Sequence, residues 1–369
     1  MWKYYQPVNV MFGEGELENL VSHLNHLNVK KAFVLADSFL VENGLVKKIQ
    51  QKTGAVIGGF TSDIEPNPTI QNVESAVNMV KEMGADCLIA FGGGSVMDCA
   101  KATAAAVAHD CDVQDLISGM QINKALPIIA IPTTAGTGSE VTAGAVLSDK
   151  EKGIKTAIFS PAIFPKLAIV DPVLTYSVPK KVTAITGIDV LAHAFDAMTS
   201  KKANDVTDAL ALQAAKLAIK NLPKVVSNGL DKKARNQMSK ASTIAGLAFS
   251  QTGTTASHAC SYILTAKYNV PHGEACAFTL DSWIKFSAKI KPELEEYAQL
   301  LGFETVDRLA DWLNHQKAIF GLKRNLSDIG INKNDLKDVV EASMSSANMT
   351  NNIGEIKQSD VLKVFESKV

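Results

Sequence analysis

The chain of 369 residues has few of the features that mark several large classes of protein. Aromatic residues make up only 6% of it, and no apolar run reaches the roughly 18 residues that a membrane-spanning helix needs. The first ten residues lack the basic and then apolar layout of a secretory signal, so we expect a cytoplasmic protein. A formal net charge of −1 gives no reason to expect nucleic acid or an acidic membrane surface as a partner.

Cysteine is also scarce, with five residues and no Cys-x-x-Cys pair. This pattern argues against a disulfide framework and against a thiolate zinc site. We therefore expect reduced and mostly buried thiols at Cys87, Cys99, Cys111, Cys260 and Cys276.

The chain changes character near its middle. Between residues 30 and 175, short β-branched runs alternate with helical stretches, a pattern typical of a parallel sheet with helices on both faces. From residue 180 onward, apolar residues recur at helical spacing and strand signals are almost absent. The sequence predicts an α/β dinucleotide-binding domain over residues 1–178 and an all-helical domain over residues 179–369. The expected strands of the first domain are residues 31–37, 55–60, 86–91 and 126–131, and its clearest helices are 70–83 and 95–107.

Two loops that follow predicted strands suit a dinucleotide. The first, Gly92-Gly93-Gly94-Ser95, opens a predicted helix, where a backbone without side chains can approach a pyrophosphate. The second, residues 132–140, offers hydroxyl groups for the ribose and nicotinamide ends of a cofactor. In an open parallel sheet, ligands bind outside the carboxyl ends of the strands. Taken alone, the glycine loop is equally typical of a tight turn without a ligand.

Asp37 ends the first predicted strand. A carboxylate at this place can accept a hydrogen bond from the 2′-hydroxyl of an adenosine ribose and repel a 2′-phosphate. The alternative is an aspartate that only caps the next helix.

One carboxylate and three imidazoles have the spacing of metal ligands. Asp189 and His193 are four residues apart in a predicted helix, which places them on one face. His258 lies in a stretch of small residues, and His272 lies in a Pro-His-Gly turn that opens a helix. This set suits ferrous iron or zinc. Buried histidines that only satisfy hydrogen bonds are the alternative.

The order of these motifs resembles the iron-containing (group III) alcohol dehydrogenase family from about residue 5 to the C-terminus. Residues 65–69 are similar to the family segment before the phosphate loop, and residues 92–98 are similar to the loop itself. Residues 133–142 resemble the threonine-rich signature. The four metal positions of the family fall on Asp189, His193, His258 and His272.

The resemblance implies an oxidoreductase that uses NAD(H), with NADP(H) as the alternative, and one Fe²⁺ or Zn²⁺ ion on a small aldehyde or primary alcohol. The metal would polarise the substrate oxygen as a Lewis acid, and the protein would be a homodimer or larger homo-oligomer. Asp37 falls on the position associated with a preference for NAD. The implied cofactor contacts are Asp37, Asn67, Gly92, Gly93, Gly94, Ser95, Asp98, Thr133, Thr134, Thr137, Ser139 and Lys155. Asp98 and Tyr262 are the implied catalytic residues.

Tyr262 marks a departure from the family pattern. Four residues after His258 the family usually carries a second histidine, a candidate proton relay, and here that position is tyrosine. The spacing still directs Tyr262 toward the metal face of the helix. Its phenol could donate a proton or bind a substrate oxygen, although an ordinary pKa of about 10 makes it a poor base at neutral pH. A packing tyrosine is the alternative.

Three other readings have weaker support. Residues 261–265 resemble a branch that reduces phosphonoacetaldehyde. This substrate is a dianion and would require a cation near the metal, for which Lys267 is a candidate. A non-redox lyase related to dehydroquinate synthase would require several basic residues near the metal. The segments that contain the histidines are poor in lysine and arginine. A catalytically inactive binding protein is suggested only by Tyr262.

Overall fold

The structure is a computed structural model that describes residues 1–150 and 154–368. The chain forms two compact units. The sheet unit comprises Gln6–Thr134 and Ser139–Thr175, and the helical unit comprises Met1–Tyr5, Ala135–Gly138 and Tyr176–Val369. The sequence predicts one boundary near residue 178, whereas the structure also assigns two short segments from the N-terminal half to the helical unit.

The sheet unit is built on a six-stranded parallel sheet with the order β1-β8-β5-β4-β2-β3. Its strands are β1 (Asn9–Phe12), β2 (Ala32–Ala36), β3 (Ile57–Thr61), β4 (Cys87–Gly92), β5 (Ile128–Pro132) and β8 (Leu167–Val170). A separate antiparallel pair is formed by β6 (Gly144–Asp149) and β7 (Ile154–Phe159).

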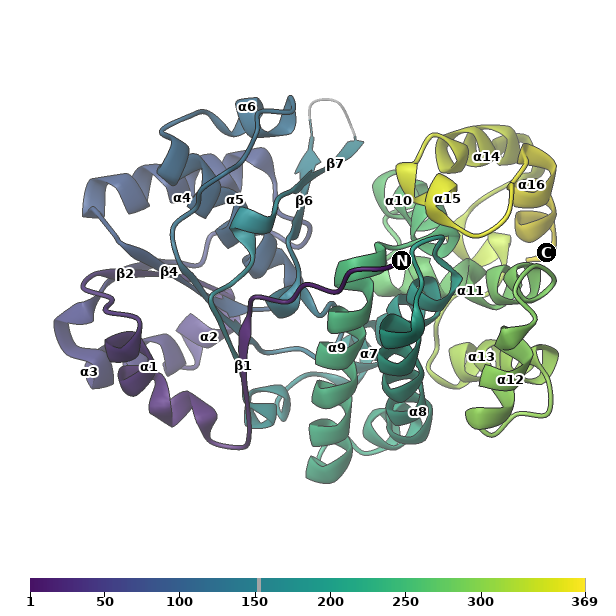
Figure 1. Cartoon of the computed structure of the whole chain (residues 1–369), viewed down its shortest axis with the longest axis horizontal. Helices are drawn as coiled ribbons and strands as arrows, with labels where there is room; N and C mark the ends of the chain where they lie inside the picture. The colour runs from purple at the N-terminus through teal and green to yellow at the C-terminus, as the bar shows by residue number, and fades with distance from the viewer. Residues whose placement is uncertain (151–153, 369) are drawn as a thin grey trace. The chain divides into compact units, whose positions relative to one another are not determined.

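Helices cover both faces of the parallel sheet (Figure 1). They are α1 (Leu20–His26), α2 (Ser38–Glu42) and α3 (Leu45–Thr53) on one face, and α4 (Ile70–Met83), α5 (Gly94–His109) and α6 (Val113–Ile117) on the other. Along β4, Ile89 and Phe91 join the core on the α1 face, while Leu88 and Ala90 join the core on the α4 face. Successive side chains of a strand point to opposite faces, so a strand buried on both sides is apolar throughout.

The carboxyl ends of β2, β4 and β5 meet at one edge of the sheet. Ala36 pairs with Phe91, and Gly92 pairs with Pro132. The backbone ladder continues one residue further, because the amide of Asp37 donates to the carbonyl of Phe91 at 3.1 Å and that of Thr133 to Gly92 at 3.1 Å. This register brings Asp37, the glycine loop and the threonine-rich loop to the same edge.

The helical unit forms no β-strand in the part of it that the structure describes, which agrees with the predicted all-helical half. Its long helices are α7 (Lys180–Thr199), α8 (Asp205–Ser227), α9 (Lys232–Thr252), α10 (Ala256–Tyr268), α11 (His272–Ala288) and α13 (Val306–Ile319). Shorter helices are α12 (Glu293–Leu300), α14 (Leu336–Met344), α15 (Ala347–Asn351) and α16 (Gln358–Glu366).

Each described helix of the chain is too short or too polar to cross a bilayer.

Alanine dominates where the long helices of this unit pack. Ala211, Ala214, Ala215 and Ala218 of α8 are fully buried in one core with residues of α7 and α9. Small side chains let helix backbones approach closely, which explains how a chain with few aromatic residues fills its core.

Candidate functional site

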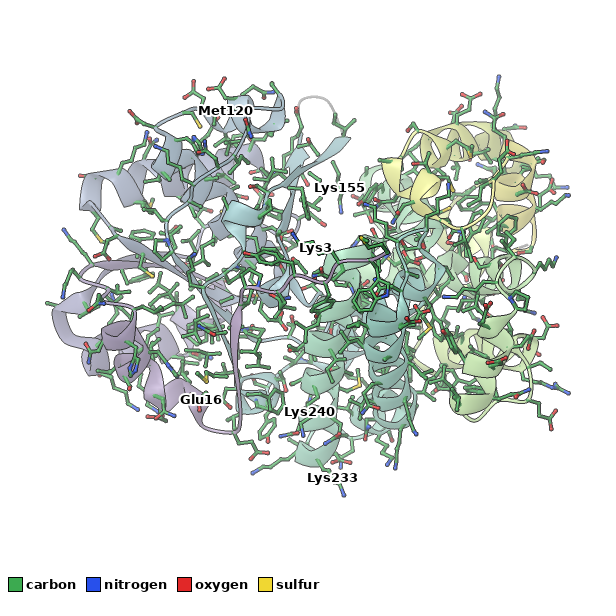
Figure 2. All side chains as sticks on the ribbon, in the orientation of Figure 1. Lys3, Glu16, Met120, Lys155, Lys233 and Lys240 are labelled. Carbon is green, nitrogen blue, oxygen red and sulfur yellow. The ribbon has the colours of Figure 1, made fainter. Side chains whose placement is uncertain are left out.

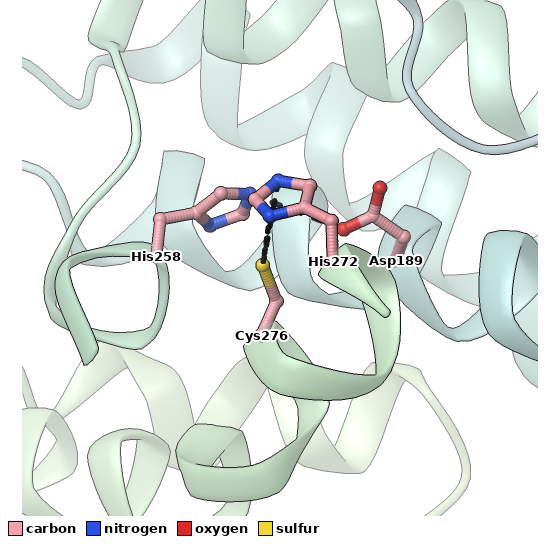
Figure 3. A group of neighbouring side chains, drawn as sticks. All are labelled: Asp189, His258, His272 and Cys276. Atoms are coloured by element: carbon pink, nitrogen blue, oxygen red, sulfur yellow. Dashed lines mark hydrogen bonds and ion pairs between the residues drawn. The ribbon is translucent and has the colours of Figure 1, made fainter. Parts of the chain in front are cut away.

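Four side chains with metal-binding chemistry converge in the helical unit (Figure 3). They are Asp189 of α7, His258 of α10, and His272 and Cys276 of α11. One donor atom from each lies within 4.8 Å of the donor atoms of the other three. Three of the four are ligands that the sequence predicts, and Cys276 is an addition.

His193, the remaining predicted ligand, lies beside this group rather than within it. Its Nδ1 is 3.9 Å from Oδ2 of Asp189, one helical turn away on α7. Its ring stacks on Phe249 with centroids 4.3 Å apart, and the centroid of His258 is 4.7 Å away. His193 is therefore a fifth donor at the edge of the cluster.

Three donor atoms of this cluster are buried without a hydrogen-bond partner among the described residues: Oδ1 of Asp189, Nδ1 of His193 and Nε2 of His258. Oδ1 of Asp189 and Nε2 of His258 are 3.9 Å apart. An unpaired buried polar atom costs about 1–3 kcal/mol. Burial lowers the pKa of His193, which leaves its ring neutral and able to bind a metal. A divalent cation would satisfy all three atoms, so the residues present fit a metal ion.

A glycine allows α11 to approach α7 closely enough to form the cluster. A Cβ atom at Gly273 would overlap the carbonyl oxygen of Ile185 and lie 2.9 Å from Cβ of Asp189. Because Gly273 directly follows His272, this close contact sets the imidazole of His272 against the α7 face that carries Asp189. The sequence motif marks this glycine only as part of a turn.

Asp196 is a functional residue that the sequence reasoning missed. Its Oδ2 lies 2.7 Å from Nδ1 of His258 and also accepts a hydrogen bond from the amide of Thr255, while its Oδ1 accepts one from the hydroxyl of Ser257. Burial would raise the pKa of Asp196, but the neighbouring His258 and these hydrogen bonds hold it below its usual value. A carboxylate in this place fixes the tautomer of a metal-binding histidine and leaves Nε2 for the metal. Its position seven residues after Asp189, on the same face of α7, was the available signal.

Tyr262 lies on the side of α10 that carries the cluster, as its spacing from His258 predicts. Its ring is 6.4 Å from that of His272 with an angle of 16° between the planes. The phenol oxygen accepts a hydrogen bond of 2.9 Å from Nδ2 of Asn348 in α15. Burial raises the pKa of Tyr262 above its ordinary value, so the phenol is protonated at neutral pH.

Lys267 is not placed to balance a charge at the metal cluster. It is exposed, its Nζ is 3.6 Å from Oδ2 of Asp338, and it lies over the ring of Tyr268. Nine residues, about two and a half helical turns, separate it from His258, which places the two on opposite faces of α10. The expectation that Lys267 is a cation near the metal is therefore wrong.

The glycine loop joins β4 to α5 in the sheet unit. A Cβ atom at Gly92 would lie 2.6 Å from Cγ2 of Val96, so the turn is closed to larger residues. Gly93 occupies the N-cap of α5 and supplies no side-chain hydrogen bond to the first turn. The N–H groups of Gly94 and Ser95, at the start of α5, therefore present the arrangement that binds a pyrophosphate, while those of Val96 and Met97 donate to the carbonyl of Gly93.

Asn67, Ser95 and Lys155 come together although they are far apart in the sequence. The amide of Asn67 donates to Oγ of Ser95 at 3.1 Å. Nζ of Lys155, on β7 (Figure 2), donates to Oδ1 of Asn67 at 2.8 Å. The β6–β7 pair thus brings a cation to the side of the glycine loop.

Asp98 and Lys101 fasten α5 to the chain that follows the threonine-rich loop. The carboxylate of Asp98 accepts hydrogen bonds from Oγ of Ser139 at 3.0 Å and from the amide of Val146 at 3.1 Å. Burial raises the pKa of Asp98 despite the nearby lysines. Both hydrogen bonds are made within the chain, so Asp98 positions the loop.

Lys101 is the second residue that the sequence reasoning missed. It is 1% exposed, and its Nζ lies 2.8–3.0 Å from four oxygens of Ser139, Thr142 and Gly144. Burial lowers its pKa to about 8, although Asp98 and Glu140 oppose this. A single lysine in an otherwise small and apolar helical stretch, three residues after Asp98, was the signal.

The other predicted cofactor residues divide between the two units. Thr133 and Thr134 directly follow β5 in the sheet unit, whereas Thr137 lies in the segment Ala135–Gly138 of the helical unit.

Asp37 is exposed, and its Oδ1 accepts a hydrogen bond of 3.0 Å from the amide of Phe39. This hydrogen bond caps α2.

Comparison with protein families settles the relationship of the chain. Residues 7–172 match the model of iron-containing alcohol dehydrogenases, and residues 183–369 match the C-terminal model of the same family. The chain belongs to the iron-containing alcohol dehydrogenase family. It is an oxidoreductase, and the resemblance seen in its motifs is confirmed.

Individual members of the family resemble the chain over most of its length. The 1-propanol dehydrogenase PduQ of Citrobacter freundii is 40% identical over 289 residues, which are 78% of this chain and 74% of that protein. The 1,3-propanediol dehydrogenase of Klebsiella pneumoniae is 32% identical and covers 99% of this chain and 98% of its own length. The crystal structure of sulfoacetaldehyde reductase from Bifidobacterium kashiwanohense, in complex with NAD⁺, superposes with a TM-score of 0.95 at 36% identity, over 100% of this chain and 98% of that one. The predicted fold is thereby confirmed.

Proposed function

We propose that this alcohol dehydrogenase interconverts a small aldehyde and its primary alcohol with NAD(H) and one divalent metal ion. The observation that carries the proposal is the convergence of unpaired, buried donor atoms of Asp189 and His258 beside His272, with Nδ1 of His193 3.9 Å from the carboxylate of Asp189. Each such atom left unpaired costs about 1–3 kcal/mol, and a bound cation would remove that cost. The named relatives act as dehydrogenases or as a reductase, so a non-redox lyase is not proposed.

In this proposal, Asp189, His193, His258 and His272 hold the metal. The ion would polarise the substrate carbonyl oxygen, while NADH would supply the hydride. Asp196 keeps Nδ1 of His258 engaged at 2.7 Å and so orients its Nε2 toward the ion. The chain itself contributes orientation and an interior that excludes water around Asp189 and His258, both nearly fully buried.

Tyr262 is proposed to donate a hydrogen bond to the substrate oxygen. In its bond with Asn348 the phenol oxygen is the acceptor, so its own proton is left for another partner. Tyr262→Phe should lower kcat about tenfold or more while metal content stays unchanged, because positioned proton donors contribute at least that much. Tyr268→Phe, a tyrosine of the same helix, is the matched control. Unaltered turnover across pH in Tyr262→Phe would make Tyr262 a packing residue.

The cofactor is proposed to bind at the carboxyl edge of the parallel sheet. The first turn of α5, with Gly92, Gly93, Gly94 and Ser95, would receive the pyrophosphate. Lys155 and Asn67 flank that turn, and Asp98 holds Ser139 in place. The hydroxyl groups of Thr133 and Thr134 are the proposed partners of the nicotinamide end, and Thr137, in the helical unit, stays a predicted cofactor contact. NAD⁺ in the sulfoacetaldehyde reductase crystal structure supports this choice of cofactor class.

Asp37 is proposed to select NAD over NADP by repelling a 2′-phosphate. Because its carboxylate also caps α2, the informative variant is Asp37→Ser, which keeps a capping oxygen and removes the charge. The preference for NADH over NADPH in kcat/KM should fall about tenfold or more, since loss of about 1.4 kcal/mol of discrimination has that effect. Asp37→Ala removes the cap as well and should lower the thermal midpoint further. Unchanged discrimination in Asp37→Ser would exclude this role.

An anionic two-carbon aldehyde, with a sulfonate or phosphonate group, is the second candidate substrate. The similarity to a structure described as sulfoacetaldehyde reductase favours it, and so does the resemblance of residues 261–265 to a phosphonoacetaldehyde-reducing branch. The cation for such a group cannot be Lys267, which faces away from the cluster.

The proposal is tested by anaerobic oxidation of NADH by protein loaded with Fe²⁺ or Zn²⁺. The substrate panel should contain glycolaldehyde, lactaldehyde, butyraldehyde, phosphonoacetaldehyde and sulfoacetaldehyde. Turnover that depends on metal is the expected result, and the ranking of aldehydes identifies the substrate class. Absence of turnover with either metal, in protein that binds NADH, would overturn the proposal.

A cytoplasmic location and a homodimeric or larger assembly are part of the same proposal. Five free cysteines suit a reducing compartment. Light scattering of the purified protein would determine the assembly.

A further inference from the structure

Cys276 is the member of the donor cluster that neither the motif nor the family resemblance provides. Its side chain is fully buried on α11, one turn after His272, and its Sγ counts among the four donor atoms that lie within 4.8 Å of one another. Figure 3 shows the thiol pointing toward the imidazole of His272. The sequence argued against a thiolate zinc site because it has no Cys-x-x-Cys pair. The fold instead brings one thiol to histidines from other parts of the chain.

The distance between Cys276 and His272 is that of two ligands of one ion. Sγ lies 3.7 Å from Nε2 and 3.8 Å from Nδ1 of His272. A nitrogen at about 2.1 Å and a sulfur at about 2.3 Å from a tetrahedral zinc ion are about 3.6 Å apart. The distance from Sγ to one nitrogen therefore fits a shared ion, but because Sγ is nearly equidistant from both nitrogens, the imidazole must rotate before that nitrogen and Sγ bind the same ion.

Independent observations show that the thiol faces a site for a cation. Oδ1 of Asp189 and Nε2 of His258 are buried, unpaired within the described chain, and only 3.9 Å apart. They belong to the same four-residue group as Sγ of Cys276. Two unsatisfied donors and a thiol around one point are the chemistry of a mixed oxygen, nitrogen and sulfur site.

We propose that Cys276 is a ligand of the metal, which it binds as a thiolate in addition to Asp189, His193, His258 and His272. This inference rests on the proposed metal-dependent function. On binding, the thiol releases its proton to solvent and a sulfur–metal bond forms, with no change in oxidation state. A thiolate favours softer ions, so this chain should retain zinc or cobalt against ferrous iron better than a variant without the sulfur.

Cys260 is the matched control. It lies only two residues after His258 and is equally buried, but its thiol contacts Trp283, Ser343 and Thr279 instead of the cluster. Cys260→Ser and Cys276→Ser thus make the same chemical change at two buried positions near a proposed ligand. A change seen only in Cys276→Ser reports on the metal and not on the loss of a buried thiol.

The first test is the absorption spectrum of full-length protein loaded with one equivalent of Co²⁺. Wild type and Cys260→Ser should show a near-ultraviolet sulfur-to-cobalt charge-transfer band, and Cys276→Ser and Cys276→Ala should lack it. Competition with a chelator should show that Cys276→Ser binds Zn²⁺ about tenfold or more weakly, since even indirect supports of a metal site contribute that much. Fe²⁺ affinity should change less.

X-ray absorption of the zinc-loaded wild type provides a test that needs no variant. A sulfur scatterer at about 2.3 Å is expected. If bound zinc has only nitrogen and oxygen neighbours while the loaded protein reduces aldehydes, the inference about Cys276 is wrong and the proposed function stands. If the protein retains no divalent metal and shows no turnover, the proposed function fails, and the inference fails with it.

Discussion

Replacing His272 with alanine is expected to abolish metal retention and to lower aldehyde turnover about a thousandfold or more. The change removes one imidazole of the cluster and leaves Asp189 and His258 without the histidine from α11. Lewis-acid polarisation contributes several kcal/mol to the barrier, and each 1.36 kcal/mol corresponds to a factor of about ten. His258→Ala should behave in the same way, because it removes a buried ligand held by Asp196.

NADH binding should survive both changes, since the proposed pyrophosphate site lies in the sheet unit and the substitutions lie in the helical unit. Metal content after gel filtration and NADH fluorescence measure the two properties separately. His315→Ala, at an exposed position of α13, is the control that removes a histidine from the same unit. Wild-type turnover in metal-free His272→Ala protein would refute the ligand assignment.

The sequence predicts the strands of the sheet unit best where they are buried on both faces of the sheet. The runs that became β2, β4 and β5 are continuously apolar and buried, and these strands and the edge strand β3 each lie within two residues of their expected positions. β1 and β8 were not among the expected strands, and both are only four residues long. The pair β6–β7 has exposed positions and antiparallel pairing, neither of which matches a βαβ pattern.

At the metal cluster, the sequence could supply ligand types but not the distances between helices. The spacing of Asp189 and His193 fixes one face of α7, since both lie on the same helix. Whether His272 reaches that face depends on Gly273, whose missing side chain lets α11 approach Ile185. Asp196 and Cys276 each share a helix face with a predicted ligand, but only the packing of the helices brings Asp196 to His258 and Cys276 into the cluster.

Lys101 was overlooked for a related reason: its partners are distant in the sequence. Its ammonium lies within hydrogen-bond distance of oxygens that are 38 to 43 residues further along the chain. No short motif records such a contact, and a lysine in a helix is ordinarily exposed. Only the fold shows that this one is enclosed.

Replacing Lys101 with methionine is expected to destabilise the sheet unit by about 3–5 kcal/mol, the range for removing one partner from a buried charge network. The carbonyl oxygens of Ser139 and Gly144 would lose their donor, and the carboxylate of Asp98 would lose the nearest cation. NADH affinity should fall too, because Ser139 is proposed to contact the cofactor. Urea unfolding and NADH titration measure the two effects. Lys81→Met, which removes an exposed lysine paired with Asp110, should change stability by at most about 1 kcal/mol.

The dependence on pH distinguishes a buried charge from simple packing. The pKa of Lys101 is lowered to about 8 in the folded chain, chiefly by burial, while an unfolded lysine titrates near 10.4. Between these values the unfolded chain holds a proton that the folded chain has released, so the free energy of unfolding rises with pH. The stability difference between wild type and Lys101→Met should therefore be constant below about pH 8 and widen above it. A difference that stays flat through pH 10 would show that the side chain acts by filling space rather than by its charge.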